Sequence, residues 1–291
     1  METIKRVIVS ICGVAPASGR AVLEPGHLLR VGRTNRADFM VPHDEHMSGA
    51  HFALTWDGAT CRLKDLGSAT GTLVGGARVE EAALAHGDWI RAGQTDFLVH
   101  YEDNTPPPQD APDQADEARR DRAAPALVGY AEKECLYALL DAARDDRILT
   151  LLRESVEEHR SLFEGVYGEV MADAAPYLVS LPARSRLLPK LAREGFGKSW
   201  GVYLTSKRRF TELRSHLRKL LMVSEEGATE LMYFRYYDPR VLRVFLPMST
   251  ARQVTEIYAE IDRFVVEGKD GANWIVFTGK NGAIQEETVA L

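Results

Sequence analysis

Residues 103–126 read DNTPPPQDAPDQADEARRDRAAPA, and this stretch decides how the chain is divided. It contains five prolines but no aromatic and no branched aliphatic residue, so we expect it to contribute nothing to a hydrophobic core. Its six acidic residues outnumber its three basic ones, and charge repulsion together with proline stiffness favours an extended, solvated chain. The sequence therefore predicts a linker over 103–126 between a domain at 1–102 and a second domain at 127–291.

The composition suits two globular domains. The 291 residues are 45% hydrophobic and 27% charged, with a net charge of −6. No apolar run approaches the roughly 20 residues of a membrane-spanning helix, and METIKRVIVSICG at the start lacks the features of a secretory signal. Cys12, Cys61 and Cys135 are too scattered for a disulfide framework or a zinc site. We expect a cytoplasmic protein without cofactor or metal.

The first domain is predicted to be an all-β sandwich. Short segments of alternating hydrophobicity are separated by turn residues every eight to twelve positions, which is typical of antiparallel strands. The clearest of these segments are IKRVIVSI (4–11), HFALTW (51–56), CRLKDL (61–66) and DFLVHY (96–101).

The second domain alternates helical and strand-like patterns, which predicts an α/β fold. Helical spacing is found from Ile148 to Val156 and over 207–221, and strand-like runs occupy 176–181, 200–206, 230–237 and 273–279. Asp238-Pro239 predicts the start of a helix. Thr250 and Gln253 predict a capping box that opens a helix ending near Gly268.

Three short patterns follow one another in the first domain: Gly32-Arg33, Ser48-Gly49-Ala50-His51 and Asp65-Leu66-Gly67-Ser68-Ala69-Thr70-Gly71-Thr72. Together they resemble the forkhead-associated (FHA) domain, whose usual signature is GR, SxxH and NGT at comparable spacing. The likeness covers nearly all of residues 1–102. It implies a β-sandwich with loops at one end that bind phosphothreonine peptides.

The residue types in these patterns suit a phosphate ligand. A phosphorylated side chain carries about −1.5 to −2 charges at pH 7, so its receptor needs a cation and hydroxyl or backbone donors. Arg33 and Ser48 supply such groups. The resemblance adds Thr70 as a third phosphopeptide-binding residue. It also implies that three residues support the loops: Gly32, His51 and Gly71.

Two positions depart from the usual FHA pattern. Thr70 stands where an asparagine usually grips the peptide backbone, and Gly49 stands where a basic residue is common. A threonine hydroxyl cannot imitate the two-ended amide of asparagine. Two interpretations therefore stay open: recognition of phosphothreonine, and docking of a protein partner without phosphate.

In the second domain, Phe234–Leu242 (FRYYDPRVL) places arginines and tyrosines around a strand-to-helix turn. With LYALLDAAR at 136–144, Trp200-Gly201 and His216-Leu217-Arg218, it closely resembles a bacterial family of type VI secretion adaptors, over about residues 134–266. The resemblance implies a non-enzymatic bacterial chaperone that stays in the cytoplasm. Such a chaperone holds a specific toxic effector and hands it to VgrG, the tip protein of the secretion needle.

We interpret five residues of this segment as effector-binding: Arg235, Tyr236, Tyr237, Asp238 and Arg240. Arg and Tyr are among the residues most enriched at binding hot spots. The alternative is a capped turn whose tyrosines complete the core. The expected partners are a type VI effector, VgrG and a phosphothreonine-containing protein, with no membrane and no nucleic acid.

Two other functions are considered. A phosphothreonine-dependent signalling scaffold that regulates secretion would rely on the first domain. A serine hydrolase would rely on Ser199 in Gly197-Lys198-Ser199-Trp200-Gly201, which matches the GxSxG elbow. That elbow needs a strand before it and a helix after it, whereas the sequence predicts a helix ending at Gly195 and then a strand. The hydrolase is therefore the least favoured function.

Positive charge is concentrated between Arg184 and Lys219, where eleven basic residues accompany two acidic ones. On the predicted helix 207–221, we expect Lys207, Arg214 and Arg218 to form a solvated basic stripe. The domain as a whole is not basic, which argues against nucleic-acid binding. The more specific alternative to a solvated stripe is that these basic residues form a docking surface for an acidic protein segment.

Overall fold

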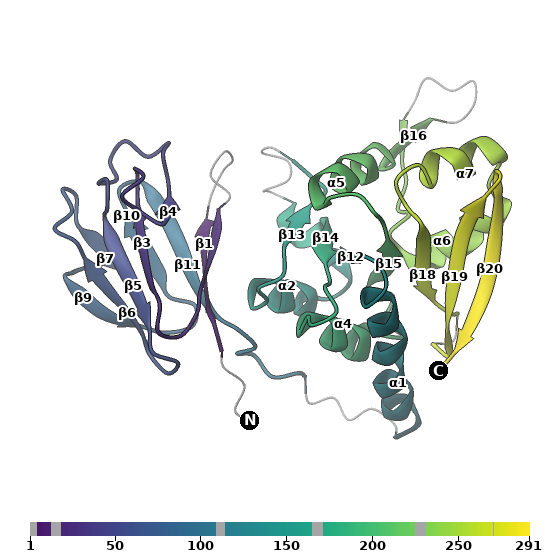
Figure 1. The fold of residues 1–291 in the computed structure, drawn as a ribbon, viewed down its shortest axis with the longest axis horizontal. Helices are drawn as coiled ribbons and strands as arrows, with labels where there is room; N and C mark the ends of the chain where they lie inside the picture. The colour runs from purple at the N-terminus through teal and green to yellow at the C-terminus, as the bar shows by residue number, and fades with distance from the viewer. Residues whose placement is uncertain (1–4, 13–18, 109–113, 165–170, 225–230, 270) are drawn as a thin grey trace. The chain divides into compact units, whose positions relative to one another are not determined.

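The computed structural model describes residues 5–12, 19–108, 114–164, 171–224, 231–269 and 271–291 (Figure 1). The chain forms two compact units. The first comprises Met1–Pro106 with Arg153–Val156, and the second comprises Pro107–Leu152 with Glu157–Leu291. Within the described residues, no helix is long and apolar enough to cross a membrane.

The first unit is built from two facing sheets. One has the order β2-β1-β11-β10-β7-β8 and the other β4-β3-β5-β6-β9, and all pairings are antiparallel except β3 with β4. The strands are β1 Val7–Cys12, β2 Arg20–Leu23, β3 Leu28–Gly32, β4 Phe39–Met40, β5 Phe52–Trp56, β6 Cys61–Asp65, β7 Thr72–Val74, β8 Ala77–Val79, β9 Glu81–Leu84, β10 Trp89–Ala92 and β11 Thr95–Tyr101.

Apolar side chains from both sheets fill the space between them. Phe52 on β5 and Phe97 on β11 are fully buried, and their rings meet edge to face with centroids 5.5 Å apart. Burial of this apolar surface away from water makes the main favourable contribution to the packing of two such sheets. The predicted β-sandwich is confirmed.

The second unit is organised around one antiparallel sheet with the order β13-β14-β12-β15-β18-β19-β20 (Figure 1). Its strands are β12 Leu136–Asp141, β13 His159–Ser161, β14 Pro176–Ser180, β15 Gly201–Thr205, β18 Arg263–Glu267, β19 Asn273–Lys280 and β20 Ala283–Ala290. A separate hairpin pairs β16 Met222–Ser224 with β17 Leu231–Tyr233. The predicted mixture of helices and strands is confirmed, and the described pairings of this sheet are all antiparallel.

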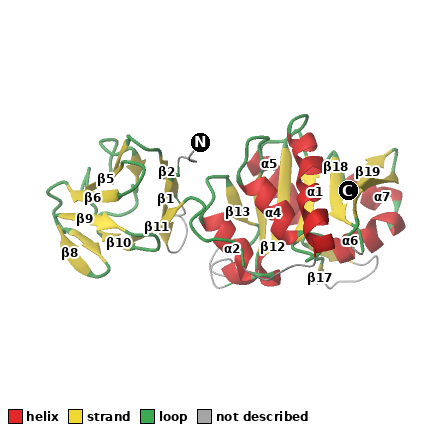
Figure 2. Ribbon diagram, turned by 90° about the horizontal axis from the view of Figure 1, so that it is seen from below, coloured by secondary structure: helices red, strands yellow, loops and turns green. Residues whose placement is uncertain are grey.

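Helices cover both faces of this sheet (Figure 2). One core includes residues of α1 Gln114–Ala131, α2 Asp146–Arg153 and α4 Leu187–Gly195. The other includes residues of α5 Phe210–Lys219, α6 Pro239–Phe245 and α7 Ala251–Ile257. Short 3-10 turns lie at η1 Ala142–Arg144, η2 Ala172–Ala174 and η3 Leu246–Met248.

Strand β12 lies between the two cores. Leu136, Ala138 and Leu140 belong to the core under α1, α2 and α4, whereas Tyr137 and Leu139 belong to the opposite core. A strand that is buried on both faces carries apolar residues at every position and so loses the alternating pattern. This explains why LYALLD gives no clear strand signal.

The predicted helix caps are confirmed. Asp238 is the N-cap of α6 and accepts from Arg240 N, with Pro239 at the first helical position. Thr250 and Gln253 form the capping box of α7. That helix nevertheless ends at Ile257, and the predicted extension to Gly268 is wrong because 263–267, rich in β-branched residues, forms the buried strand β18.

The predicted linker also needs correction. Helix α1 begins at Gln114, so the expectation of an extended chain is wrong for the last part of 103–126; residues 109–113 lie outside the described residues. Ala123 is fully buried in a core together with Leu127. Alanine is the best helix former and is small enough to pack closely, so a segment without branched side chains can still be part of a core.

Candidate functional site

Three loops meet at one end of the sandwich. The first follows β3, the second lies between β4 and β5, and the third lies between β6 and β7. Arg33 N donates to Ser48 O at 2.9 Å, and Arg33 Nε donates to Met47 O at 3.2 Å. A Cβ on Gly32 would lie 2.4 Å from Gly49 O, so this close approach of the first two loops requires glycine.

His51 joins the second loop to the third. Its ring is fully buried, Nδ1 accepts from Ser48 N at 3.1 Å, and Nε2 lies 3.1 Å from Gly71 O. Because a carbonyl can only accept, Nε2 is the protonated nitrogen. Gly71 has a left-handed φ of 78°, and a Cβ there would lie 2.6 Å from Arg78 Nε. Gly32, His51 and Gly71 therefore all lie where the loops meet.

The predicted phosphopeptide-binding residues are on these same loops. Ser48 Oγ accepts from Ala69 N at 3.0 Å, which leaves the hydroxyl hydrogen available to a ligand. Thr70 Oγ1 donates to His46 O at 3.3 Å, and its residue is exposed, as is Arg33. Arg33, Ser48 and Thr70 are thus connected through the backbone contacts of one loop cluster.

Asp65 holds the third loop, and the sequence reasoning missed it. Its carboxylate accepts from the hydroxyls of Ser68 and Thr72, both at 2.6 Å, and from the amides of Gly67 and Ser68. Although burial acts in the opposite direction, these hydrogen bonds lower the pKa of Asp65. The signal was present in Asp65-Leu66-Gly67-Ser68, where an aspartate stands two residues before a glycine, a usual pattern for a side-chain-stabilised turn.

Asp44 has a similar role in the second loop. It is buried, and it accepts from His46 N, Gln94 N and Thr95 Oγ1 at 2.7 to 3.0 Å. The Asp44 carboxylate thus fixes the loop formed by residues 42–48 (PHDEHMS). Among the described residues, no group of three or more His, Cys, Asp or Glu side chains is placed to hold a metal.

In the second unit, the predicted effector-binding segment is only partly exposed. Tyr236 and Tyr237 are buried, and Tyr236 Oη donates to Leu217 O at 2.7 Å. Asp238 is also buried, and its carboxylate is held by Arg240 through Nη2 at 2.6 Å. The interpretation of Tyr236, Tyr237 and Asp238 as direct contacts is therefore corrected, because these side chains complete the core and cap α6. Of the five residues, Arg235 and Arg240 remain exposed.

Arg235 is paired with a residue 94 positions earlier. Its Nη2 lies 2.5 Å from Oδ2 of Asp141, a buried carboxylate at the end of β12. Asp141 Oδ1 also accepts from Ala143 N at 3.2 Å. The guanidinium of Arg235 lies 5.8 Å from the centre of the Tyr237 ring, within range of a cation–π contact. Arg235 is thus held in one position while about half of its side chain faces solvent.

The serine of the GxSxG pattern has a structural role. Helix α4 precedes Ser199 and strand β15 follows it, as predicted. Ser199 has a left-handed φ of 56°, and both its N and its Oγ donate to Glu267 Oε1, at 3.0 and 2.9 Å. Gly197 N donates to the other oxygen of that carboxylate at 2.8 Å. Burial raises the pKa of Glu267, although these hydrogen bonds oppose the rise.

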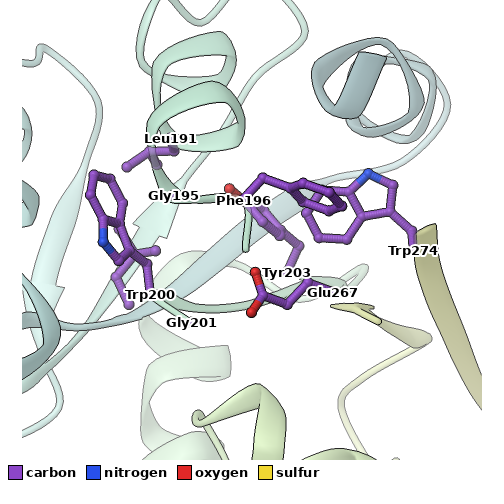
Figure 3. Close-up of a pocket in the computed structure, with 9 residues that line it drawn as sticks. Leu191, Gly195, Phe196, Trp200, Gly201, Tyr203, Glu267 and Trp274 are labelled. Carbon is purple, nitrogen blue, oxygen red and sulfur yellow. The ribbon is translucent and has the colours of Figure 1, made fainter. Parts of the chain in front are cut away.

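The space beside this carboxylate is small. Trp200, Tyr203, Glu267 and Trp274 help to line a cavity of about 10 Å³ (Figure 3). That volume holds about one water molecule and has no room for a substrate. Within the described residues, no histidine is hydrogen-bonded to Ser199, whose hydroxyl is held by the Glu267 carboxylate.

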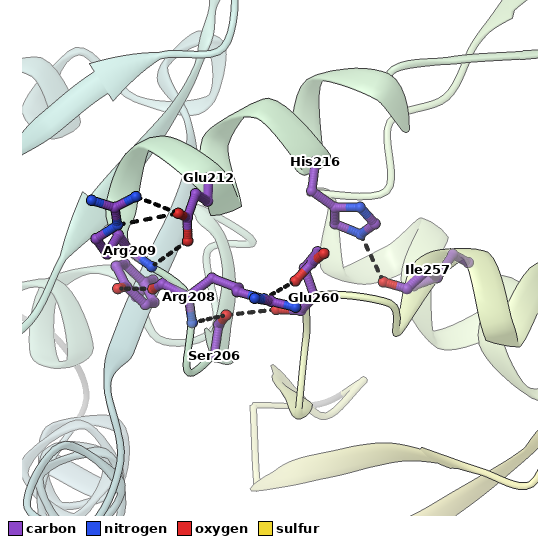
Figure 4. A network of polar contacts seen from close by, with 8 residues as sticks. Ser206, Arg208, Arg209, Glu212, His216, Ile257 and Glu260 are labelled. Carbon is purple, nitrogen blue, oxygen red and sulfur yellow. Dashed lines mark hydrogen bonds and ion pairs between the residues drawn. The ribbon is translucent and has the colours of Figure 1, made fainter.

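The basic stretch is largely neutralised by neighbouring carboxylates. Arg208 pairs with Glu260, and Arg209 pairs with Glu212 at 2.6 Å (Figure 4). His216 Nε2 lies 3.0 Å from the carbonyl oxygen of Ile257, which ties α5 to α7. These residues hold the structure together rather than forming an unpaired positive surface.

The predicted basic stripe on α5 is wrong for two of its three members. Arg214 pairs with Glu164 at 2.6 Å, and Arg218 pairs with the same carboxylate at 2.8 Å. Arg214 also donates to Ser161 O and Arg218 to Leu162 O. Both arginines therefore fasten α5 to β13 and the residues that follow it, whereas Lys207 is exposed as expected.

Comparison with known proteins agrees with the two units. Residues 29–93 match the family described as FHA domain, and residues 136–256 match the family described as Domain of unknown function (DUF4123). The FHA domain-containing protein FhaA of Mycobacterium tuberculosis is 42% identical over 69 residues, which span 24% of this chain and 13% of FhaA. FHA and DUF4123 are interaction domains.

Two solved structures resemble the first unit. An FHA domain from a study of phosphothreonine-dependent FHA domain interactions is 34% identical, with 33% of this chain and 95% of that chain covered and a TM-score of 0.30. The FhaA FHA domain complexed with the intracellular domain of Rv3910 is also 34% identical, with 32% and 99% covered and a TM-score of 0.30. The two family matches place an FHA domain in the N-terminal part of the chain and, in its C-terminal part, a DUF4123 domain, the type VI effector chaperone-like domain.

Proposed function

We propose that this protein is a cytoplasmic adaptor of a bacterial type VI secretion system. Its DUF4123 domain binds a specific toxic effector and helps to load it onto the VgrG spike. Its FHA domain docks a second partner, through phosphothreonine or without it. The two binding domains on one chain would raise the effective concentration of one partner near the other.

The observation that carries this proposal is the presence of these two interaction domains in one chain. Each has exposed arginines whose positions are fixed by hydrogen bonds or ion pairs. In the FHA domain, Arg33 and Ser48 lie on loops that His51 and Asp65 hold in place. A phosphate would find a cation and a hydroxyl donor there at little cost in ordering the receptor. Phosphothreonine-dependent docking is therefore the form that we favour for this domain.

In the DUF4123 domain, Arg235 and Arg240 are the exposed members of the FRYYDPR turn. Buried carboxylates fix both guanidinium groups, because Asp141 holds Arg235 and Asp238 holds Arg240. A side chain that is already ordered loses less conformational entropy on binding, which favours these two as effector contacts.

The test is effector export from the native bacterium, with the full-length protein expressed from its own locus. We expect Arg235→Ala with Arg240→Ala to reduce both effector export and the amount of effector that co-purifies with VgrG. Arg252→Ala is the matched control, since Arg252 is an exposed arginine paired with Glu256 on α7. Immunoblots verify equal protein levels. Normal export from a strain that lacks residues 127–291 would contradict the adaptor role.

The loop cluster also favours one second function, a phosphothreonine-dependent signalling scaffold that regulates secretion. Under that function Arg33→Ala would abolish capture of a phosphorylated partner, and the Arg235 and Arg240 substitutions would leave effector loading unchanged. The adaptor predicts that the Arg235 and Arg240 substitutions reduce loading. The same export assay therefore separates the two functions.

A further inference from the structure

The FHA loop that carries Ser48 has no side chain at the next position, so Gly49 brings no charge to the loop beside the Ser48 hydroxyl. A side chain at Gly49 would begin 3.0 Å from Thr34 Oγ1 and 3.9 Å from Arg36 Cδ. The space beside Gly49 is therefore bordered by Thr34 and Arg36 of the first loop, and Arg36 is the basic residue of this pair.

Thr34 fixes the first loop against Gly49. Its amide and its hydroxyl both donate to Gly49 O at 3.2 Å. The same hydroxyl accepts from Arg36 N at 3.4 Å, and Ala37 N donates to Thr34 O at 3.0 Å to close a turn. These local hydrogen bonds hold the first loop against Gly49, with the Arg36 side chain 3.9 Å from the Cβ position of Gly49.

The charge of Arg36 is available to a ligand. The residue is exposed, and among the described residues no hydrogen bond or ion pair engages its guanidinium. By contrast, Arg33 uses Nε to donate to Met47 O, and Ser48 Oγ accepts from Ala69 N.

We infer that Arg36 reaches past Gly49 and supplies the second cation for the phosphate of a phosphothreonine peptide. The inference rests on the proposed phosphate docking by this domain. The lack of a side chain at Gly49 leaves room for the guanidinium, and Arg33, Arg36 and the Ser48 hydroxyl together donate to the phosphate oxygens. Arginine is well suited to this role because its planar fork matches phosphate geometry.

The test measures phosphate preference with the full-length protein. The probe is a fluorescein-labelled peptide mixture in which a fixed phosphothreonine is flanked by randomised residues. The control mixture is identical except that threonine replaces the phosphothreonine. Fluorescence anisotropy gives the affinity ratio of the two. We expect Arg36→Ala to lower this ratio about tenfold or more, the loss of one charge-assisted hydrogen bond. Arg62→Ala, which removes an exposed arginine on β6, should leave the ratio unchanged.

Gly49→Arg provides the matched rescue. In the Arg36→Ala background it should restore most of the preference, since the cation then comes from the second loop and only Thr34 Oγ1 must shift slightly. Arg36→Ala behaving like Arg62→Ala, while the wild type prefers phosphothreonine, would overturn this inference alone. If the phosphate preference is lost in Arg36→Ala and is restored neither by adding Gly49→Arg nor by using Arg36→Lys in place of Arg36→Ala, the loop itself is disturbed. That outcome would also overturn the inference. A wild-type protein without phosphate preference would contradict the proposed phosphate docking itself.

Discussion

Replacing Arg235 with alanine tests whether the exposed arginine of the FRYYDPR turn also stabilises the domain. Asp141 is 1% exposed, and its Oδ2 lies 2.5 Å from Arg235 Nη2. After Arg235→Ala, Asp141 would keep its hydrogen bond from Ala143 N at 3.2 Å but would lose its counterion. A buried carboxylate without a counterion is costly, so we expect the DUF4123 domain to be destabilised.

The size of the effect follows from the burial of the two partners. Removing one member of a fully buried ion pair costs about 3–5 kcal/mol, whereas an exposed pair contributes about 0–1 kcal/mol. Arg235 is 45% exposed, so water can partly solvate Asp141 after the substitution. We therefore expect a loss of about 1.5–3 kcal/mol in the free energy of unfolding. For a domain of this size that lowers Tm by about 3–12 °C.

The assay is guanidinium chloride unfolding followed by tryptophan fluorescence. Trp200 and Trp274 are buried in the DUF4123 domain, and the other two tryptophans are in the FHA domain, whose transition serves as an internal reference. Asp141→Asn should reduce the cost of Arg235→Ala by about 1 kcal/mol or more, because an amide needs no counterion. This double-mutant cycle isolates the interaction between the two side chains.

Arg240→Ala is the matched control. Its partner Asp238 is also buried, but Arg240 N still donates to Asp238 Oδ1 at 2.9 Å after the side chain is removed. We expect a smaller loss, about 0.5–1.5 kcal/mol. The reasoning would be refuted if Arg235→Ala unfolded within about 0.3 kcal/mol of the wild type. It would be refuted as well if Arg235→Ala cost the same in the presence and in the absence of the Asp141→Asn substitution.

Three further predictions concern the loops. Gly32→Ala would place a Cβ 2.4 Å from Gly49 O, so we expect an FHA domain less stable by about 2 kcal/mol or more and a loss of phosphopeptide binding, measured by melting and anisotropy. The pKa of Asp65 is lowered on folding, so its stabilisation is present above the unfolded value of 3.8 and is lost as pH falls through the folded one; the stability difference between wild type and Asp65→Asn should therefore shrink between pH 7 and pH 3. Ser199→Ala removes one hydrogen bond to Glu267 and should cost about 1 kcal/mol without changing effector export; a lost hydrolytic activity would contradict the structural role.

The sequence predicted the FHA part of the chain well because its signals are local. Alternation within short strands indicates a half-buried sheet, and the loops between them carry Gly32, His51 and Gly71 at recognisable spacing. The carboxylates of Asp44 and Asp65 were missed because an exposed loop aspartate and a buried one look alike in sequence. Only the fold shows that Asp65 accepts from amides and hydroxyls close to it in the chain, whereas Asp44 also accepts from Gln94 and Thr95, 50 and 51 positions away.

The DUF4123 part was harder to predict because its decisive contacts are distant in sequence. Arg235 meets Asp141 across 94 positions, which no periodicity reveals. Tyr236 and Tyr237 could be either hot-spot or core residues, since tyrosine is common in both places. Their burial became evident only once α6 and the sheet were seen to enclose them.

Three polar side chains support the loops at one end of the FHA domain. Their hydrogen bonds bear on whether these loops form a binding site for a ligand. His51 and Asp44 are buried polar side chains and Asp65 is partly buried, and burial of a polar group is unfavourable unless hydrogen bonds replace the lost solvation. His51 bonds to residues of the loops, and Asp65 does so apart from Thr72 on β7, whereas Asp44 also accepts from Gln94 and from Thr95 on β11. In the proposed phosphate docking, the departures at Gly49 and Thr70 change the ligand contacts and leave the hydrogen bonds of His51, Asp44 and Asp65 in place, so Arg36 can supply its charge to loops that are already held.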